Sequence, residues 1–399
     1  MSVPKPNTLL CTIGVSLFYP NLSNLVKEAQ TDRVLYELAE AYSKAVKEQE
    51  RRIDRKSERR VPDREWKEVG PLLRHVKPTD RLCGAEINSV TDLVGQGSIE
   101  QDRLHLFHSD TDDGEAIAKV LESYFTSLSS PWNVNIHRVE GLRDDEPDKF
   151  RTQGLRNLAK LFGEQVREAR QNNRSCAINA TGGYKAQIAI AVLMGQALDI
   201  PVYYKHERFN AIIPFPPMPV ALDFSLWERA SGMFIVLAKG DACEPWKRFE
   251  DDWDERFEPL VNRVSMDGKD YLELSATGQI FHETFRSRFQ ESKATNLPRK
   301  AKPDEKEPPK LGDHAYNQAR KPICRFLERV TELPYVRYCH TTYWNPDLPE
   351  STRFRMSGGK IQGIYSDGSW CVKFEVFTTA TDPAQLPVVV ADLNDWLDT

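Results

Sequence analysis

Residues 179–185, Asn-Ala-Thr-Gly-Gly-Tyr-Lys, decide the fold expected for the first half of this chain. They join a short apolar run, Cys176–Asn179, to the segment Tyr184–Leu198, which is apolar nearly all round. A buried strand that leads through glycines into a buried helix is typical of α/β proteins. Two adjacent glycines let the backbone approach a ligand closely, and the free amides at a helix start favour an anion. With the hydroxyl of Thr181 and the charge of Lys185, the stretch predicts a phosphate-binding turn, the alternative being a plain tight turn.

Strands and helices are predicted to alternate around this turn. Before them, a long helical region covers about residues 21–68, and its charged second half is interpreted as a solvated face. The predicted strands are 7–13, 103–108, 134–139, 176–179 and 202–205, and the predicted helices are 114–128, 150–170 and 184–198. This alternation indicates a mostly parallel, doubly wound sheet, which binds ligands at the carboxyl ends of its strands.

After Pro219 the pattern changes. Residues 224–238 and 246–264 are predicted to be helical, followed by a hairpin over 264–274 with an Asp267-Gly268 turn and a helix over 275–289. A hairpin beside helices indicates a winged-helix-like connecting module over residues 223–290. Because its charge is mixed and lacks a basic stripe, a structural or dimerisation role is favoured over DNA binding.

The remaining chain is predicted to be a linker and a small α+β domain. Residues 291–312 are polar, lysine-rich and contain four prolines, which indicates a linker. Residues 313–399 then begin with helical sequence to residue 332, with a break expected at Pro322. Strands are predicted at 336–344, 361–365 and 370–378, with a closing helix at 391–397. The short turns between the strands indicate an antiparallel sheet.

Composition limits the classes of function. The chain of 399 residues has a net charge of -5, which argues against non-specific binding to nucleic acid or membranes. Its seven cysteines are scattered without a CxxC pair, which argues against zinc and a disulfide framework. Neither GxxxxGK[ST] nor GxGxxG occurs at the glycine turn. With no targeting segment or long apolar run, we expect a cytoplasmic protein without a membrane span.

Several motifs in the first half occur in an order that resembles the CARF domains of CRISPR systems. Besides the Thr-Gly-Gly-Tyr-Lys turn, they are Thr12–Leu17, Gly84–Ser89, Ser109–Thr111 and Val139–Leu142. The resemblance covers roughly residues 5–220 and implies a Rossmann-like sensor domain over residues 1–222. It implies a homodimer that binds a cyclic oligoadenylate, most often cyclic tetra-adenylate (cA4), as an allosteric activator rather than a cofactor. The implied ligand-binding residues are Gly14, Ser16, Leu17, Glu86, Ser109, Asp110, Thr111, Thr181, Gly182, Gly183, Tyr184 and Lys185.

The last domain is locally basic. Between Arg320 and Lys373 there are nine Lys or Arg against five Asp or Glu. The predicted order of short helices and an antiparallel sheet with dispersed Arg, Lys and Tyr resembles the RelE family of mRNA interferases, although no sharp motif carries the resemblance. It implies metal-independent mRNA cleavage on the ribosome by attack of the 2′-hydroxyl. The candidate catalytic residues are Arg337, His340, Tyr343, Arg353, Arg355 and Lys360.

Together these resemblances predict an endoribonuclease that is activated by cyclic oligoadenylate and acts on ribosome-bound mRNA, with the ribosomal stalk considered as a docking point. A metal site is not expected, because residues 335–380 contain no Glu-x-Lys strand motif. The Arg-x4-His spacing of Arg103 and His108 is attributed to chance because both residues lie on a predicted strand. Two alternatives remain: a ligand-responsive DNA-binding regulator, and a ring nuclease with a non-catalytic C-terminal domain.

Overall fold

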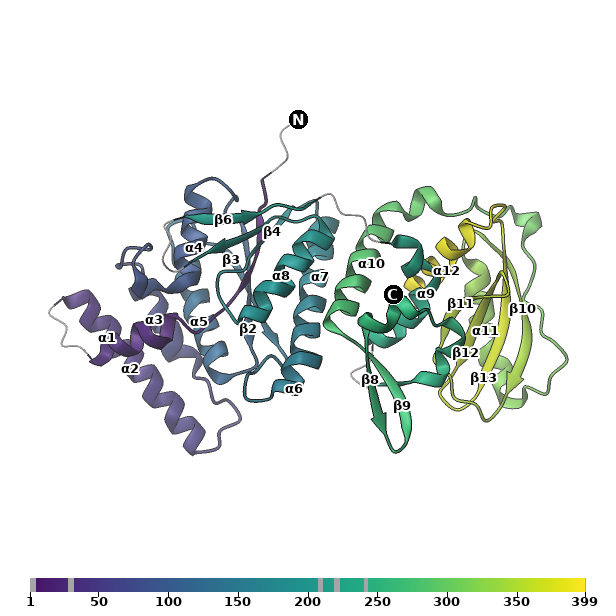
Figure 1. Ribbon diagram of the computed structural model, residues 1–399, viewed down its shortest axis with the longest axis horizontal. Helices are drawn as coiled ribbons and strands as arrows, with labels where there is room; N and C mark the ends of the chain where they lie inside the picture. The colour runs from purple at the N-terminus through teal and green to yellow at the C-terminus, as the bar shows by residue number, and fades with distance from the viewer. Residues whose placement is uncertain (1–4, 28–31, 207–210, 219–222, 240–242, 399) are drawn as a thin grey trace. The chain divides into compact units, whose positions relative to one another are not determined.

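The computed structural model describes residues 5–27, 32–206, 211–218, 223–239 and 243–398. The chain divides into two units, residues 1–220 and 221–399 (Figure 1). The first is α/β with a mixed sheet, and the second carries two antiparallel sheets. The predicted domain boundary at residue 222 falls in the segment 219–222, outside the described residues.

A six-stranded sheet forms the centre of the first unit, in the order β3-β2-β1-β4-β5-β6. The strands β1 to β5 are parallel and β6 is antiparallel. They are β1 (Thr8–Thr12), β2 (Arg103–Ser109), β3 (Asn133–Val139), β4 (Cys176–Asn179), β5 (Val202–Lys205) and β6 (Ile212–Phe215). The predicted doubly wound sheet is therefore confirmed, while β6, which has no alternating pattern, was not predicted. Strand order reverses between β1 and β4, so the topological switch point lies there.

Helices cover both faces of this sheet. Figure 1 shows α4 and α5 on one side and α7 and α8 on the other. The helices of this unit are α1 (Ser23–Lys27), α2 (Arg33–Asp54), α3 (Asp63–Leu73), α4 (Gly84–Gly95), α5 (Asp112–Thr126), α6 (Pro147–Lys149), α7 (Leu155–Gln171) and α8 (Lys185–Leu198). The single helical region expected over 21–68 is interrupted between α2 and α3, where Pro62 has extended backbone and precedes the first residue of α3.

The second unit begins with two helices and a three-stranded sheet. Its elements are α9 (Phe224–Lys239), β7 (Glu244–Pro245), β8 (Val261–Met266), β9 (Lys269–Leu274) and α10 (Ala276–Asn296). The predicted hairpin is confirmed, since Met266 pairs with Lys269 across Asp267-Gly268, and both turn residues have positive φ. The helix expected over 246–264 is wrong. Short 3-10 turns and the start of β8 replace it, because Pro259 and the acidic 250–255 stretch oppose a continuous helix.

A four-stranded antiparallel sheet, in the order β10-β13-β12-β11, forms the rest of this unit. Its elements are α11 (Arg320–Glu332), β10 (Val336–Asn345), β11 (Arg353–Ser357), β12 (Lys360–Ser366), β13 (Cys371–Thr378) and α12 (Gln385–Leu397). The helix α11 packs against β10, and α12 packs against β11. Pro322 does not break α11, because it is the third residue of the helix, where the backbone amide would have no partner within the helix.

One helix, α12, contributes to both hydrophobic cores of the second unit. Val388 and Ala391 belong to the core around α9 and α10, while Val389 and Val390 belong to the core under the four-stranded sheet. The buried amide of Asn394 joins the elements further, because it donates to Ser231 of α9 and exchanges two hydrogen bonds with the backbone of Phe354 in β11. The predicted boundaries at 290 and 312 therefore fall inside one unit.

The segment predicted as a linker, residues 291–312, is ordered in the structure. Its first six residues continue α10 to Asn296. Farther on, the backbone of Lys310 donates to Cys339 and accepts from Thr341, so this segment runs beside the edge of β10. Its prolines and lysines suit a sheet edge as well as a linker.

Candidate functional site

The loops after β1 and β4 meet at the switch point of the first unit. The hydroxyl of Thr12 donates to the carbonyl of Gly182 at 2.5 Å. On the other side, the amide of Gly14 donates to the carboxylate of Glu86, in the first turn of α4, at 2.7 Å. Three segments that are far apart in the sequence are thus fixed to one another at the edge where doubly wound sheets bind ligands.

Two glycines are required by this geometry. A Cβ on Gly182 would lie 2.1 Å from a carboxylate oxygen of Glu86, and Gly183 has a φ of +98°. Among the described residues, the amides of Gly182, Gly183 and Lys185 have no intramolecular acceptor. Lys185 is the first residue of α8, and its exposed side chain forms no ion pair within the described ranges. The turn therefore presents free amides and one cation, as an anion site needs.

Glu86 lies under this turn and is fully buried. One of its carboxylate oxygens accepts from Gly14, while the other, Oε2, has no partner in the described part of the chain. Burial raises the pKa of Glu86 to about 7, although the hydrogen bond from Gly14 works in the opposite direction. Glu86 was predicted to touch the ligand, but the structure places it as a residue that holds the Gly14 loop.

Replacing Glu86 by glutamine should remove a pH dependence of stability. The folded state binds this proton more tightly than the unfolded chain, because its pKa is about 7 against an ordinary value of 4.5. The stabilisation is full below pH 4.5 and is lost as the pH rises through 7, which amounts to roughly 3 kcal/mol. Urea unfolding at several pH values should show this loss in the wild type and not in Glu86→Gln. Parallel pH curves for the two proteins would contradict the prediction.

Four other residues predicted to bind the ligand take part in local structure instead. Ser16 accepts a hydrogen bond from the amide of Ala85, and Leu17 is fully buried, so its side chain contributes to the core. Thr111 caps α5 by accepting from Gly114, and Ser109 is buried beside it. These side chains shape the loops, and Leu17 has no surface to offer a ligand.

Asp110 holds a neighbouring loop instead of facing an open site. It accepts from the amide of Gly141 at 2.9 Å and from Arg138. Burial opposes its ionisation, but these two donors keep the pKa of Asp110 below its ordinary value. The carboxylate is therefore already paired in this structure.

Sequence reasoning missed several residues that shape the turn. Asn179 accepts from the backbone and hydroxyl of Thr181, and the Thr181 hydroxyl in turn accepts from the amide of Lys205. Gln187 accepts from the amide of Tyr184 at 2.5 Å, while its own Nε2 is buried without a partner among the described residues. The polar character of Asn179 and Gln187 within apolar runs was the signal that could have revealed them.

Two predicted catalytic arginines of the second unit are covered. The side chain of Arg353 is 2% exposed and contacts Glu350, Asp252 and the carbonyl of Arg248. The side chain of Arg355 is 10% exposed and contacts Asp251 and Asp252. The acidic turn 250–252 thus takes up these guanidinium groups, which corrects their prediction as open phosphate-binding residues.

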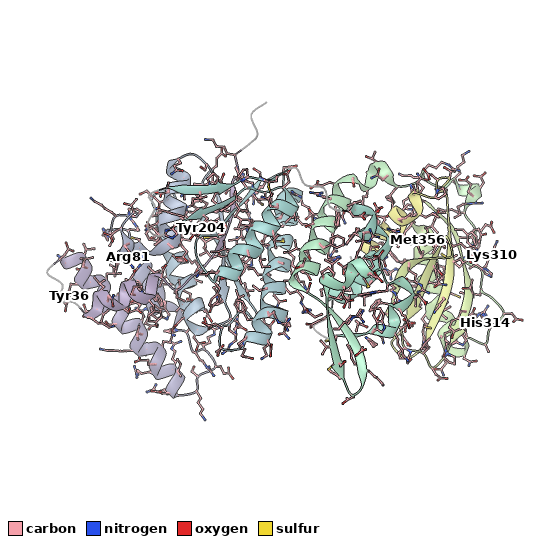
Figure 2. All side chains as sticks on the ribbon, in the orientation of Figure 1. Tyr36, Arg81, Tyr204, Lys310, His314 and Met356 are labelled. Atoms are coloured by element: carbon pink, nitrogen blue, oxygen red, sulfur yellow. The ribbon has the colours of Figure 1, made fainter. Side chains whose placement is uncertain are left out.

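One face of the four-stranded sheet carries a line of polar residues that crosses all four strands and the chain segment at Lys310. The line is exposed at Lys310 and covered at Arg355. The backbone of Lys310 pairs with that of His340 on β10 in an isolated β-bridge. His340 in turn lies opposite Glu375 of β13. Gln362 of β12 follows, and Arg355 of β11 ends the line. We call these five residues the polar row. Figure 2 labels Lys310 at the edge of the unit. Lys360 binds Glu375 at 2.9 Å, and His340 is the cross-strand neighbour of the same residue, which was not predicted.

The remaining predicted residues, Arg337 and Tyr343, lie on β10. The Nε of Arg337 is buried without a partner among the described residues. Tyr343 is 40% exposed, and a register shift between Thr341 and Tyr343 places it opposite Lys373. The alternation of faces along β10 is therefore interrupted near its end, because a bulge changes which face a residue occupies.

The described residues contain no group of three or more His, Cys, Asp or Glu side chains that could hold a metal ion. In the same residues, no helix combines the length and apolar character that crossing a bilayer requires.

Comparison with known proteins adds one finding. Residues 81–218 match a family model described as CRISPR-associated protein (Cas_APE2256). This segment is therefore similar to a CRISPR-associated family. It begins just before α4 and ends after β6, so it includes Glu86 and the turn 179–185. No curated protein matches the sequence.

Proposed function

We propose that this chain is a sensor and effector of type III CRISPR antiviral defence. In this proposal a cyclic oligoadenylate, cA4, binds a CARF-type first unit and activates a RelE-like, ribosome-dependent endoribonuclease in the second. The observation that carries the proposal is the turn 181–185, which offers unpaired amides and a lysine at the switch point of the six-stranded sheet. The turn lies within residues 81–218, which match a CRISPR-associated family. A CRISPR-associated protein with a phosphate cradle suits a signalling nucleotide.

The ligand site would use backbone amides that have no acceptor among the described residues, together with the exposed Lys185. The amides of Gly182 and Gly183 would donate to a phosphate, and Lys185 would supply a charge-assisted bond. Glu86 and Gln187 would fix the loops rather than touch the ligand, because both are buried and bonded to backbone amides. A symmetric cyclic ligand fits a two-fold dimer, since each copy presents the same turn. We therefore propose that the protein binds cA4 as a homodimer.

The nuclease chemistry would take place on the face of the four-stranded sheet that carries the polar row. The 2′-oxygen of the RNA would attack the neighbouring phosphorus, and the bond to the 5′-oxygen of the next nucleotide would break. His340 and Glu375 would take the proton from the 2′-hydroxyl and return one to the leaving oxygen. Lys360 and Lys310 would stabilise the charge that develops on the phosphate. No step requires a metal ion.

The activator response should depend on Lys185. Because hydrogen bonds to charged groups contribute about 1.5–3 kcal/mol, Lys185→Gln should raise the cA4 concentration for half-maximal cleavage by roughly 10- to 150-fold. Cleavage of ribosome-bound mRNA is measured in a reconstituted translation system, beside naked RNA, with and without cA4. Lys47→Gln is the matched control, since Lys47 is an exposed lysine of α2 in the same unit.

The outcomes separate the proposal from its rivals. Cutting of ribosome-bound message that needs cA4 and is weakened in Lys185→Gln supports the proposal. If cA4 binds and no RNA is cut in any condition, the effector half is refuted, and a DNA-binding assay tests a regulator. Dependence on the ribosomal stalk would be read from ribosomes depleted of their stalk proteins.

A further inference from the structure

Two tyrosines of β10 each lie beneath a lysine. The Nζ of Lys310 is 4.3 Å from the ring centroid of Tyr338, and the Nζ of Lys373 is 5.4 Å from that of Tyr343. In sequence the two rings lie on either side of His340, the β10 member of the polar row. Along β10, a lysine over an aromatic ring therefore lies on each side of His340.

The two pairs differ in how much of the ring is open. Tyr338 stacks on Phe377 of β13, with centroids 4.3 Å apart and planes 10° apart, and Lys310 lies over it. Tyr343 has no ring partner among the described residues and is 40% exposed, with Asn345 donating to its hydroxyl. The Tyr343 ring therefore has a surface available to a flat partner.

The two lysines beside these rings can also bind a ligand, because neither is held in a buried ion pair in the described part of the chain. Lys373 has no ion-pair partner within the described ranges, and Lys310 pairs with Glu307, whose side chain is 44% exposed. Exposed ion pairs such as Lys310–Glu307 contribute little and are easily exchanged. An exposed sheet face that combines aromatic rings with lysines suits unpaired nucleic acid, since bases stack on the rings and phosphates bind the cations.

We propose that Tyr343, Lys373 and Lys310, here called the β10 strip, bind an unpaired segment of RNA. A base stacks on Tyr343, and the flanking phosphates bind Lys373 and Lys310, which brings the strand across His340 and Glu375. Bases in a duplex are stacked on one another, so a paired segment cannot use the Tyr343 ring. This inference rests on the proposed nuclease function and names its substrate class. It assigns Tyr343 to binding rather than to proton transfer.

Binding of RNA to the full chain tests the strip without requiring cleavage. Fluorescence anisotropy is measured with a short unpaired RNA carrying 2′-O-methyl groups, which blocks attack by the 2′-oxygen, and with a hairpin of the same length, each with and without cA4. Stacking on one aromatic ring contributes about 1–3 kcal/mol, so Tyr343→Ala should weaken binding of the unpaired RNA by roughly 5- to 150-fold. Tyr343→Phe keeps the ring and should bind like the wild type.

The lysines give a second, independent measurement. Because each phosphate contact to a single strand contributes about 0.7 to the slope of log affinity against log salt, Lys373→Gln should reduce that slope by about 0.7. The control for Tyr343→Ala is Tyr36→Ala, which removes an exposed tyrosine of α2 in the first unit and should leave the affinity for RNA unchanged (Figure 2).

Unchanged binding in a folded Tyr343→Ala, or equal binding of hairpin and unpaired RNA, would overturn the inference even if the protein cuts RNA. A loss of binding in both Tyr343→Ala and Tyr343→Phe would also overturn it, because stacking does not need the hydroxyl. If the strip binds RNA as expected but no condition produces cleavage, the proposed function fails while the strip stands.

Discussion

Replacing Arg353 by alanine is expected to lower the free energy of unfolding of the second unit by about 3–5 kcal/mol. The side chain of Arg353 is 2% exposed, and its guanidinium contacts Glu350, Asp252 and the carbonyl of Arg248. Its removal leaves Asp252 buried with one fewer cation, and burial already raises the pKa of Asp252. Chemical denaturation followed by tryptophan fluorescence measures the loss.

Arg256→Ala is the matched control for this measurement. Arg256 pairs with Asp223 and Asp254 in the same unit, but its side chain is 52% exposed. Ion pairs in such positions contribute about 0–1 kcal/mol, so this variant should unfold almost like the wild type. A cost of less than 1 kcal/mol for Arg353→Ala would contradict the structural role, and would reopen Arg353 as a residue that meets substrate.

Replacing Gly182 by alanine should abolish the anion site. The new Cβ would lie 2.1 Å from Glu86 and 2.8 Å from the amide of Gly14, so the loops after β1 and β4 must separate. We expect at least a tenfold loss of cA4 affinity, and overpacking of this kind costs about 1–3 kcal/mol of stability. Isothermal titration calorimetry measures the affinity, and thermal unfolding measures the stability.

Gly95→Ala controls for the loss of a glycine in the same unit. Gly95 is the last residue of α4, and a Cβ there would meet nothing within 4 Å. Binding of cA4 should therefore be unchanged in this variant. Equal affinities for wild type and Gly182→Ala would show that the ligand does not use this turn.

The sequence pattern predicted the five parallel strands of the first unit, because strand-like and helical segments alternate along it, but it did not predict β6. All the predicted strands there form, since alternation of strands and helices leaves little choice of sheet. The role of Glu86 was not predictable, because the partner of its carboxylate, Gly14, is far away in the sequence. A sequence motif identifies a turn, but it does not show which of the backbone amides there already donate hydrogen bonds within the protein.

The second unit was harder to predict, because its cores are assembled from distant segments. Arg353 and Arg355 lie two residues apart on β11, yet their ion pairs depend on the acidic turn 250–252, about a hundred residues earlier in the sequence. Local charge counts could not show this pairing. Likewise, a proline-rich segment that runs beside a sheet edge has the composition of a linker, as residues 297–312 do.

Because α12 contributes to two cores, the second unit should melt as one cooperative block. Asn394 joins α9, β11 and α12 through buried hydrogen bonds, so neither half can open without breaking the other. A fragment of residues 313–399 would expose the apolar side of α12 that Val388 and Ala391 present to α9. Such a fragment should aggregate rather than act as a free-standing enzyme, and a minimal effector must begin with α9.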